Sequence, residues 1–319
     1  MEADQFSKFI NENNIALDPL TQEFVDTGLK QGSQVVIGEE VVVKPSTLNE
    51  VATYGILEKY QDQLLSSLPS IITPLIVASN SEFMAIGRLP EIKPTSVDEH
   101  FGWGADFTQE QIETLVSGLQ QLREIIPVSE VGNQDDPEEN LEGILAFLSN
   151  RNDKSEVIEA GLEHQYDALQ ELYLQSQSVI CTSPAYFSHK DVVRGNLAIG
   201  RNSMSLIDWE TCGRARVGYD EGRFTVQLCM EPTQQELVSR VMEERYEDST
   251  ETLLSYWRTV ASRSYKELTF ALTGKYDERI ARKFIEESVQ ASFKDDLTAS
   301  LKNSLGWSLG KFKSKVNQI

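Results

Sequence analysis

The 319-residue chain has few of the residues that build disulfide or metal frameworks. It holds three cysteines and three histidines, and no two cysteines form a C-x-x-C pair. An odd number of widely spaced cysteines argues against a disulfide scaffold or a zinc site and indicates a reducing compartment. No run approaches the roughly 18 apolar residues of a membrane span, and the N-terminal MEADQFSKFI lacks the basic-then-apolar pattern of a signal peptide. We therefore expect a cytoplasmic protein.

Positive charge is also scarce. The chain has 29 basic residues against 50 acidic ones, a formal net charge of −21. Such a surface is a poor partner for nucleic acid or an anionic membrane, whereas a cationic substrate would be attracted to it. The same charge also serves solubility. The contents of 40 % hydrophobic and 25 % charged residues are ordinary for a globular protein with one large domain or two lobes.

The sequence contains no G-x-x-x-x-G-K-[ST] motif and no internal repeat. A P-loop nucleotide-binding protein is therefore disfavoured, because that class cradles its phosphates with this motif. Any nucleotide site must be built from other residues.

The stretch from Ser188 to Glu210, SHKDVVRGNLAIGRNSMSLIDWE, holds two short apolar runs on either side of a turn-rich tetrapeptide at 200–203. This pattern predicts a β-hairpin. If the hairpin is centred on Asn202, Asn196 faces Asp208, and facing residues in such a ribbon lie roughly 5 Å apart. An amide oxygen and a carboxylate are then expected side by side at the open end of the hairpin.

Asp191 adds a second carboxylate at the open end of the hairpin, because it lies in the loop that leads into the first strand. Mg²⁺ takes hard oxygen ligands, usually one or two carboxylates together with substrate phosphates. A single aspartate at a strand end is more often a solvated or capping residue. Here the hairpin pairing and the D-x-x-x-x-N spacing of Asp191 and Asn196 agree independently, so the hairpin predicts a metal and phosphate site.

These residues also carry a resemblance to a known family. HKDVVRGN followed by IDWE resembles the H-x-D-x-x-x-x-N loop and the aspartate metal motif of protein kinases and their small-molecule relatives. The I-D-W-E form is similar to the aminoglycoside phosphotransferase and choline kinase superfamily, since protein kinases usually have D-F-G. The resemblance implies an ATP- or GTP-dependent kinase with an alcohol acceptor, in which Asp191 is the base or orienter of the hydroxyl and Asn196 and Asp208 hold Mg²⁺.

The resemblance extends to the surrounding residues, with two departures. It implies that His189 is the scaffold histidine of the loop and that Asp220, in GYD at 218–220, supports the loop structurally. Lys190 replaces the common small residue before the aspartate, and Arg194 replaces the usual proline. Neither change removes a reacting group, but both leave the substrate class open.

A second hairpin is predicted where 35–37 and 41–43, both runs of β-branched residues, surround Gly38. Lys44 ends the second strand, at a position that resembles the kinase lysine contacting the α- and β-phosphates. A lysine at a strand end is otherwise more often a solvated charge. Ser33 precedes the hairpin and is a candidate for a backbone cradle over the phosphates, although an ordinary turn uses the same residues.

Glu50 is the expected partner of Lys44, in a helix predicted to begin near Thr47. A competing interpretation exists, because Thr47-x-x-Glu50 is also a capping box, in which the glutamate serves only the start of the helix. Glu58, further along the same helix, is the fallback partner.

Two strand-like runs, TPLIVAS and EFMAIGRL, resemble the last strands of a kinase N-lobe. The resemblance then implies that the hinge follows Phe83 and that backbone groups of Met84, Ala85 and Gly87 bind adenine. The alternative is a hairpin that only packs the core.

Beyond a linker marked by prolines and by FGWG at 101–104, the sequence is mostly helical from 108 onward. The layout predicts an α+β, bilobal, protein-kinase-like fold. Residues 1–89 form a small β-rich nucleotide-binding N-lobe, and residues 90–319 form a larger, mainly helical C-lobe with the catalytic hairpin and the substrate site.

The predicted function is transfer of the γ-phosphoryl group of Mg-ATP or Mg-GTP to a hydroxyl of a small acceptor. The negative charge favours an amine-bearing acceptor (aminoglycoside-like, choline-like or an amino sugar). The alternative is a catalytically weak pseudokinase or regulatory module, which Lys190 and the sparse glycine loop motivate. A metal-dependent phosphohydrolase is a third option, but it ordinarily needs more histidine or aspartate ligands.

Overall fold

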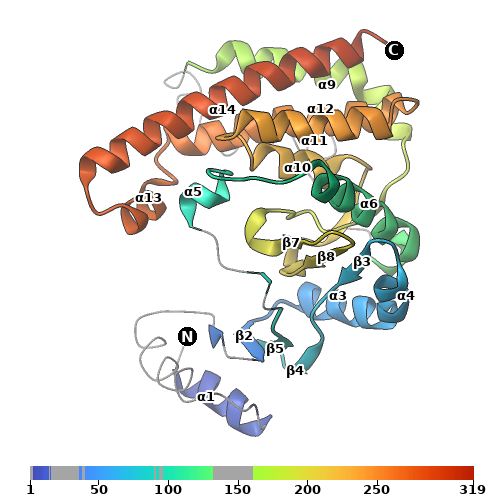
Figure 1. Ribbon diagram of the computed structural model, residues 1–319, viewed down its shortest axis with the longest axis vertical. Helices are drawn as coiled ribbons and strands as arrows, with labels where there is room; N and C mark the ends of the chain where they lie inside the picture. Colours follow the sequence, from blue (N-terminus) through green and yellow to red (C-terminus); the bar gives the residue numbers. More distant parts are fainter. Residues whose placement is uncertain are drawn as a thin grey trace.

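The computed structural model describes residues 3–13, 15, 36–37, 40–89, 91–92, 96–131 and 161–319. A small region rich in β-strands carries the N-terminus, and a larger helical region carries the C-terminus (Figure 1). This is the α+β, two-region architecture that the sequence predicts. Within the described ranges, every helix is too short or too polar to cross a membrane.

The N-terminal sheet has four antiparallel strands in the order β1-β2-β5-β4. They are β1 (Val36–Ile37), β2 (Val41–Pro45), β5 (Phe83–Gly87) and β4 (Ile76–Ser79). β-Branched residues favour these strands. Phe9 and Ile10 of α1 (Ala3–Glu12) pack with Val43 and Phe83 in a small separate core. The turn predicted at Gly38 lies outside the described residues.

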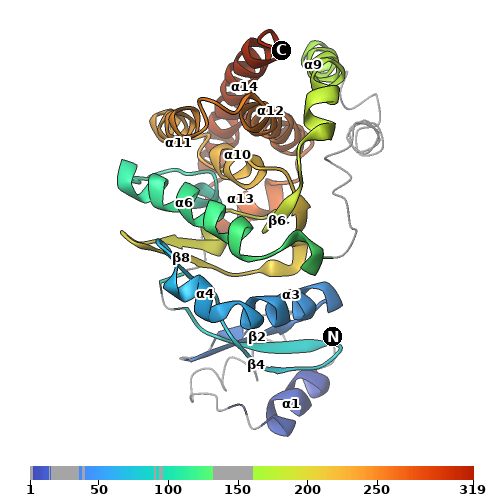
Figure 2. The ribbon, with the colours of Figure 1, turned by 90° about the vertical axis from the view of Figure 1, so that its right-hand side faces the viewer.

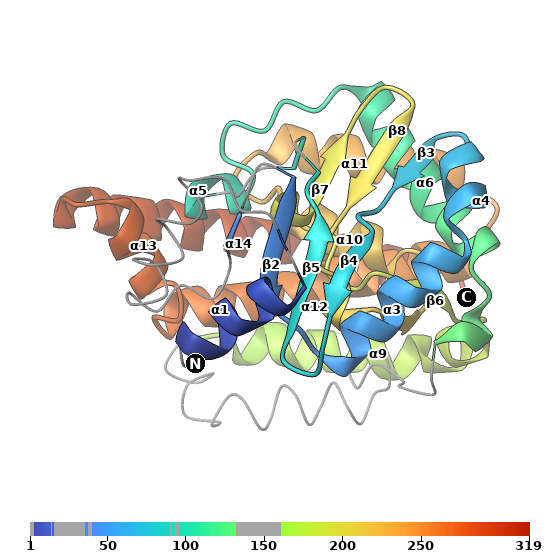
Figure 3. The same cartoon turned by 90° about the horizontal axis from the view of Figure 1, so that it is seen from below.

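A second sheet connects the two regions. α3 (Leu48–Lys59) and α4 (Gln61–Ser66) lead into β3 (Ser70–Ile72). β3 pairs in parallel with β8 (Ser203–Leu206), which pairs antiparallel with β7 (Leu197–Ile199). Figure 3 shows this sheet beside the N-terminal one. A strand from before residue 89 therefore belongs to the same sheet as the predicted catalytic hairpin.

The C-terminal region is built mainly from helices that cover the hairpin on the side away from the N-terminal sheet (Figure 2). The longer helices are α6 (Gln109–Ile125), α9 (Glu163–Thr182), α10 (Tyr219–Val226), α11 (Pro232–Arg245), α12 (Thr250–Leu272) and α14 (Glu287–Val316). Shorter elements are α5 (Val97–His100), α13 (Asp277–Lys283), η2 (Val128–Glu130), η3 (Arg194–Asn196), η4 (Trp209–Thr211), β6 (Tyr186–Ser188) and β9 (Gly213–Ala215).

The helices follow the apolar periodicity of the sequence. α6 begins at the predicted capping box, in which Thr108 and Gln111 exchange hydrogen bonds of 3.0 and 3.2 Å. Its stripe of Ile112, Leu115 and Leu119 is fully buried. The main core joins these residues to the hairpin and to α12 and α14, so the hairpin rests on a rigid helical base.

Candidate active site

The catalytic hairpin forms, but its register differs from the prediction. β7 and β8 pair so that Leu197 faces Leu206. The prediction centred on Asn202 is therefore wrong by one residue. Gly200 N–H donates to Ser203 O at 2.8 Å, which closes a turn with two residues at its tip and centres the hairpin between two residues instead of on one.

The corrected register places Ile207, not Asp208, opposite Asn196. Ile207 N–H donates to Asn196 O at 3.0 Å, so Asp208 lies one residue beyond the last pair. Asp208 has φ 66° and ψ 63°, in the left-handed region that non-glycine residues seldom occupy. Backbone strain of this kind is typical of functional sites. The Asp208 carboxylate meets a lysine from the N-terminal sheet.

That lysine is Lys44 of β2. Its Nζ lies 2.9 Å from Glu50 Oε1 on α3 and 2.5 Å from Asp208 Oδ1 after β8. Burial lowers the pKa of Lys44, but the charges and hydrogen bonds of Asp208 and Glu50 outweigh burial, so the pKa is raised. Three separate segments therefore meet at a charged ammonium group, which joins the N-terminal region to the hairpin.

Glu50 is the partner of Lys44, as expected, and the fallback Glu58 is not needed. Thr47 caps α3 by accepting a hydrogen bond of 3.1 Å from Glu50 N–H, while the Glu50 side chain turns to Lys44. Glu50 is 0 % exposed, and its burial raises the pKa more than the attraction of Lys44 lowers it. The charged carboxylate is therefore held in place at a cost in stability.

Asp191 lies in the loop before η3 and has two partners. Asn196 Nδ2 donates to Asp191 Oδ2 and to its backbone oxygen, both at 3.1 Å. Arg223 of α10 makes an ion pair with Asp191 Oδ1. Arg223 was missed at the sequence level. Its position three residues after Asp220 could have indicated it, since residues at i and i+3 share a helix face.

Asp220 supports the loop that carries Asp191 through hydrogen bonds to residues 188–190. The carboxylate is 1 % exposed, and it accepts hydrogen bonds from Ser188 Oγ at 2.8 Å, His189 N–H at 3.2 Å and Lys190 N–H at 2.8 Å. Lys190 has φ 62°, a conformation that a lysine rarely adopts. The three hydrogen bonds hold the backbone in this conformation, so the contacts agree with the supporting role expected of Asp220.

His189 connects the loop to the hairpin. Its Nε2 lies 2.8 Å from Ile207 O, and its Nδ1 accepts a hydrogen bond of 3.2 Å from Asp191 N–H. Because Nδ1 accepts, Nε2 carries the proton and donates to the carbonyl. Burial lowers the pKa of His189, so the imidazole is neutral. The histidine fixes the backbone on both sides of the site and has no free nitrogen for proton transfer.

Oxygen ligands gather around Asp208. Carboxylate oxygens of Glu50, Asp208 and Glu210 lie within 4.8 Å of one another. The Asn196 amide nitrogen faces Asp191, so its oxygen is the end left for a cation. Burial, and then the charge of Asp208, raises the pKa of Glu210. Hard oxygen donors crowded in this way fit Mg²⁺. Glu210 was missed as a possible ligand at the sequence level.

The hinge prediction requires a correction. β5 lies between β2 and β4, and Met84 and Ala85 pair with residues of both neighbouring strands. A central strand uses its backbone groups in the sheet. Gly87 N–H donates to Leu75 O at 2.9 Å. Backbone groups of these three residues are thus engaged in the sheet and with Leu75, which conflicts with the predicted adenine contacts. Ser33, the other predicted phosphate contact, lies outside the described residues.

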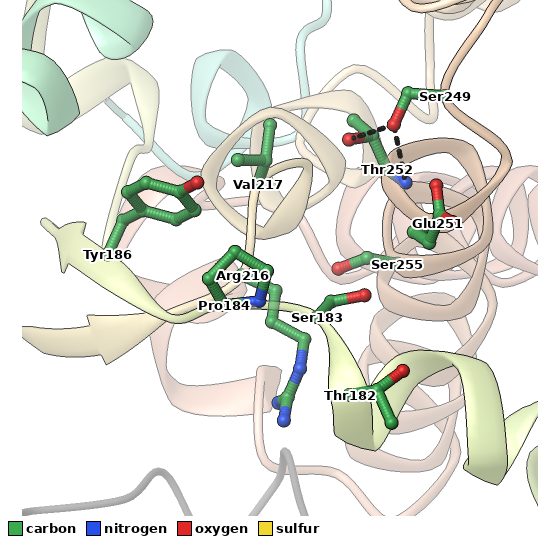
Figure 4. A pocket seen from close by; sticks show the side chains of 10 residues that line it. All are labelled: Thr182, Ser183, Pro184, Tyr186, Arg216, Val217, Ser249, Glu251, Thr252 and Ser255. Carbon is green, nitrogen blue, oxygen red and sulfur yellow. Dashed lines mark hydrogen bonds between the residues drawn. The ribbon is translucent and has the colours of Figure 1, made fainter.

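A polar cavity of about 290 Å³ lies elsewhere, where α9, β6, the loop before α10 and the start of α12 meet (Figure 4). Ser249 caps α12 there, accepting from Thr252 N–H at 3.4 Å and donating to Thr252 Oγ1 at 2.9 Å. Its lining residues include none of those around Lys44, Asp191 and Asp208. The cavity is separate from the candidate active site.

Comparison with known proteins gives likeness of structure only. No family model matches the chain, and no curated protein gives a significant sequence match. A choline/ethanolamine kinase family protein from Mesorhizobium loti aligns with a TM-score of 0.52 at 15 % identity, covering 88 % of this chain and 89 % of that one. An aminoglycoside phosphotransferase from Alicyclobacillus acidocaldarius aligns with a TM-score of 0.58 at 12 % identity, covering 89 % and 90 %.

A third similar structure is a GDP complex of an aminoglycoside 2'-phosphotransferase, with a TM-score of 0.52 at 13 % identity and coverage of 86 % and 89 %. Likenesses at this identity establish the fold. The chain has the fold of aminoglycoside phosphotransferases and choline kinases, and at this level the resemblance read from the sequence is confirmed.

Proposed function

We propose that this chain, which has the fold of small-molecule phosphotransferases, transfers the γ-phosphoryl group of a Mg-bound nucleoside triphosphate to a hydroxyl of a small acceptor. The observation that carries the proposal is the position of Lys44. Its Nζ lies 2.9 Å from Glu50 Oε1 and 2.5 Å from Asp208 Oδ1. Asp208 follows the hairpin, and Asn196 directly precedes its first strand. In phosphoryl transfer the protein contributes mainly positioning and charge neutralisation, and this cluster supplies both.

On the nucleotide side, Lys44 binds the α- and β-phosphates and Glu50 keeps its ammonium oriented. Asp208, which pairs with Lys44 in the free protein, would turn to the metal when the nucleotide is bound. Asn196, Asp208 and Glu210 are the residues that would hold Mg²⁺. When bound, the metal neutralises the phosphate oxygens.

On the acceptor side, Asp191 accepts a hydrogen bond from the acceptor hydroxyl. As the new bond from that oxygen to the γ-phosphorus forms, the bond to the bridging oxygen breaks and the nucleoside diphosphate leaves. The hydroxyl proton passes to Asp191. Asn196 fixes the carboxylate for this role, because its Nδ2 donates to Asp191 Oδ2.

The choice between ATP and GTP, and the amine-bearing acceptor, belong to the proposal. The structural neighbour with bound GDP supports a guanine nucleotide. The names of the choline/ethanolamine kinase and the aminoglycoside phosphotransferase, with the net charge of −21, are the arguments for an amine. The division into a nucleotide-binding part before residue 90 and a substrate-binding part after it belongs to the same proposal.

One observation favours the second candidate, a catalytically weak nucleotide-binding module. Arg223 already neutralises Asp191, the residue assigned to the acceptor hydroxyl. A carboxylate that keeps this partner in the nucleotide complex would transfer phosphate slowly. Nucleotide binding without diphosphate release over all acceptors would support this candidate.

The proposal is tested by thermal shift with Mg-ATP and Mg-GTP, followed by a coupled ADP-release assay over amino sugars, choline, small alcohols and hydroxy acids. We expect a nucleotide-dependent rise in melting temperature that is lost in Lys44→Ala. Lys59→Ala is the matched control, because Lys59 is an exposed lysine paired with Glu130. The proposal would be overturned if neither nucleotide bound.

A further inference from the structure

Helix α3 brings a second polar residue, besides Glu50, to the candidate metal site. The helix lies between the N-terminal sheet and the catalytic hairpin (Figure 2), and it contacts both β4 and η4. The residue before Glu50 is Asn49. Its Nδ2 donates to Glu210 O at 2.8 Å and to Cys212 O at 3.4 Å. These carbonyls belong to η4 and its last flanking residue, so Asn49 holds the backbone of the turn that follows Asp208.

The contacts form a closed circuit through two neighbouring residues of α3. Glu50 binds Lys44, and Lys44 binds Asp208. Two residues beyond Asp208, the backbone oxygen of Glu210 accepts the hydrogen bond from Asn49. One helix therefore holds both ends of the segment from Asp208 to Glu210, one end by charge and the other by a hydrogen bond.

The hydrogen bond from Asn49 acts against electrostatic repulsion. Carboxylate oxygens of Glu50, Asp208 and Glu210 lie within 4.8 Å of one another, and Lys44 binds the first two. One ammonium group cannot balance three carboxylates, so these acids repel one another when no further cation is present. Glu210 is the exposed member of the three, and repulsion would turn it toward solvent. Asn49 keeps the backbone that carries this carboxylate beside Asp208.

The function proposed above is the basis of the following step, because the metal site belongs to it. We propose that Asn49 is a positioning residue of this site, and that it holds Glu210 beside Asp208 so that the oxygen ligands are in place before Mg²⁺ binds. Asn49 donates its amide N–H groups to backbone oxygens, so its effect passes through Glu210. Removing a group that orients a metal ligand typically lowers metal affinity by about 10- to 100-fold.

A second contact between α3 and η4 separates this role from general packing. Thr53, one turn after Asn49, places its Oγ1 3.1 Å from Cys212 Sγ. This contact lies at the end of η4 and does not involve Glu210. Thr53→Val removes the hydroxyl but nearly preserves the shape of the side chain. It therefore weakens the packing of α3 on η4 and leaves the hydrogen bond from Asn49 to Glu210 in place.

The test measures the affinity of AMP-PNP, a nucleotide that cannot transfer its phosphate, by isothermal titration in Mg²⁺ and in EDTA. The ratio of the two affinities is the gain that the metal provides. We expect Asn49→Ala to lower the affinity in Mg²⁺ by at least about 10-fold and to leave the affinity in EDTA undiminished. Alanine is the best helix former, so the variant should keep α3 folded.

Two control variants should retain the full gain. The first is Thr53→Val, which tests packing of the same helix on the same turn. The second is Asn13→Ala, because Asn13 Nδ2 also donates to a backbone oxygen at 2.8 Å, that of Phe9 in α1.

A double-mutant cycle tests whether Asn49 acts through Glu210. Glu210→Gln alone should reduce the gain, because a charged oxygen ligand is lost. Adding Asn49→Ala to this variant should change the gain by less than about 2-fold, since residues that act through one another give non-additive effects. Independent, additive losses would show that Asn49 does not act through Glu210.

The possible failures can be told apart. If the wild-type protein does not bind AMP-PNP, or binds it equally in Mg²⁺ and EDTA, the proposed function fails. If the wild type shows the gain and Asn49→Ala retains it, the role of Asn49 is refuted and the proposed function stands. The role is also refuted if Thr53→Val loses the gain to the same extent, or if Asn49→Ala binds as poorly in EDTA as in Mg²⁺.

Discussion

The two sides of the catalytic segment differ in charge. Toward the N-terminal sheet, on the acidic side, carboxylates of Glu50, Asp208 and Glu210 lie close together and the first two bind Lys44. Toward the helices, on what we call the basic side after Arg223, that arginine pairs with Asp191 and neutralises it. The first side has an excess of negative charge and suits a cation, whereas the second is a neutral ion pair. The net charge of −21 therefore does not describe the surroundings of Asp191.

The two sides also differ in how they are held. Each side holds a residue in the left-handed region, Asp208 on the acidic side and Lys190 on the basic side. The acidic side also buries Glu50, whose pKa is raised. The basic side rests on Asp220, which accepts three hydrogen bonds from the loop that carries Asp191. The acidic side is thus held mainly by charges, and the basic side mainly by hydrogen bonds to its backbone.

The largest effect is expected from Asp208→Asn on the acidic side. Removing the charge should abolish measurable ADP release, because the proposed metal would lose its anionic ligand. The melting temperature should change little. The coupled assay and a thermal melt check both statements, with the exposed Asp248→Asn as the control. Substantial turnover by Asp208→Asn would remove the distinction between the two sides.

Asp191→Ala, on the basic side, should lower kcat by roughly 10²- to 10⁴-fold, the scale of a general base. Mg-ATP should bind with nearly unchanged affinity, since the nucleotide contacts lie on the other side of the hairpin. Steady-state kinetics and nucleotide titration measure the two quantities. Full activity would show that Asp191 neither orients nor deprotonates the acceptor.

Glu50→Gln should lower kcat by roughly 10- to 100-fold, because Lys44 loses one of the groups that orient it. Stability should hold or rise. The pKa of Glu50 is raised in the folded protein, so its ionised form costs stability above that pKa, and glutamine removes the cost. A clear fall in melting temperature at neutral pH would show instead that the ion pair stabilises the fold.

The smallest effect is expected from His100→Gln. Burial, followed by the charge of Arg279, lowers the pKa of His100 to about 4, against 6.5 for an ordinary histidine. The group therefore contributes stability above pH 6.5 that is lost as the pH falls toward 4, because the unfolded chain takes up the proton first. As the pH falls from 6.5 to 4, the free energy of unfolding of the variant should decrease by about 1–2 kcal/mol less than that of the wild type. Denaturant melts across this pH range measure the difference. Parallel pH profiles would contradict this environment for His100.

The sequence predicted those parts of the site that depend on local pattern. Alternating apolar runs indicated both hairpins, and a capping threonine followed by Glu50 indicated the helix that meets Lys44. The register of the catalytic hairpin could not be derived in the same way, because a shift of one residue depends on how the turn at 200–203 closes. Asp208 lies beyond the last pair in a left-handed conformation, which no propensity predicts.

Other features depend on contacts between distant residues. β5 resembles a hinge in sequence, but its place between β2 and β4 uses its backbone groups. Arg223 reaches Asp191 from a helix 32 residues away along the chain, and only the fold brings the two together. The partner of Asp191 therefore could not be found from composition.

The most direct test of the central claim, that Lys44 and Asp208 form a site for a metal-bound nucleotide, is isothermal titration of the wild-type protein with AMP-PNP in Mg²⁺ and in EDTA. We expect one site per chain whose affinity is at least about 10-fold higher with Mg²⁺, because the phosphates and the acidic cluster repel one another without it. Equal affinity in the two conditions, or no binding in Mg²⁺, would contradict the claim.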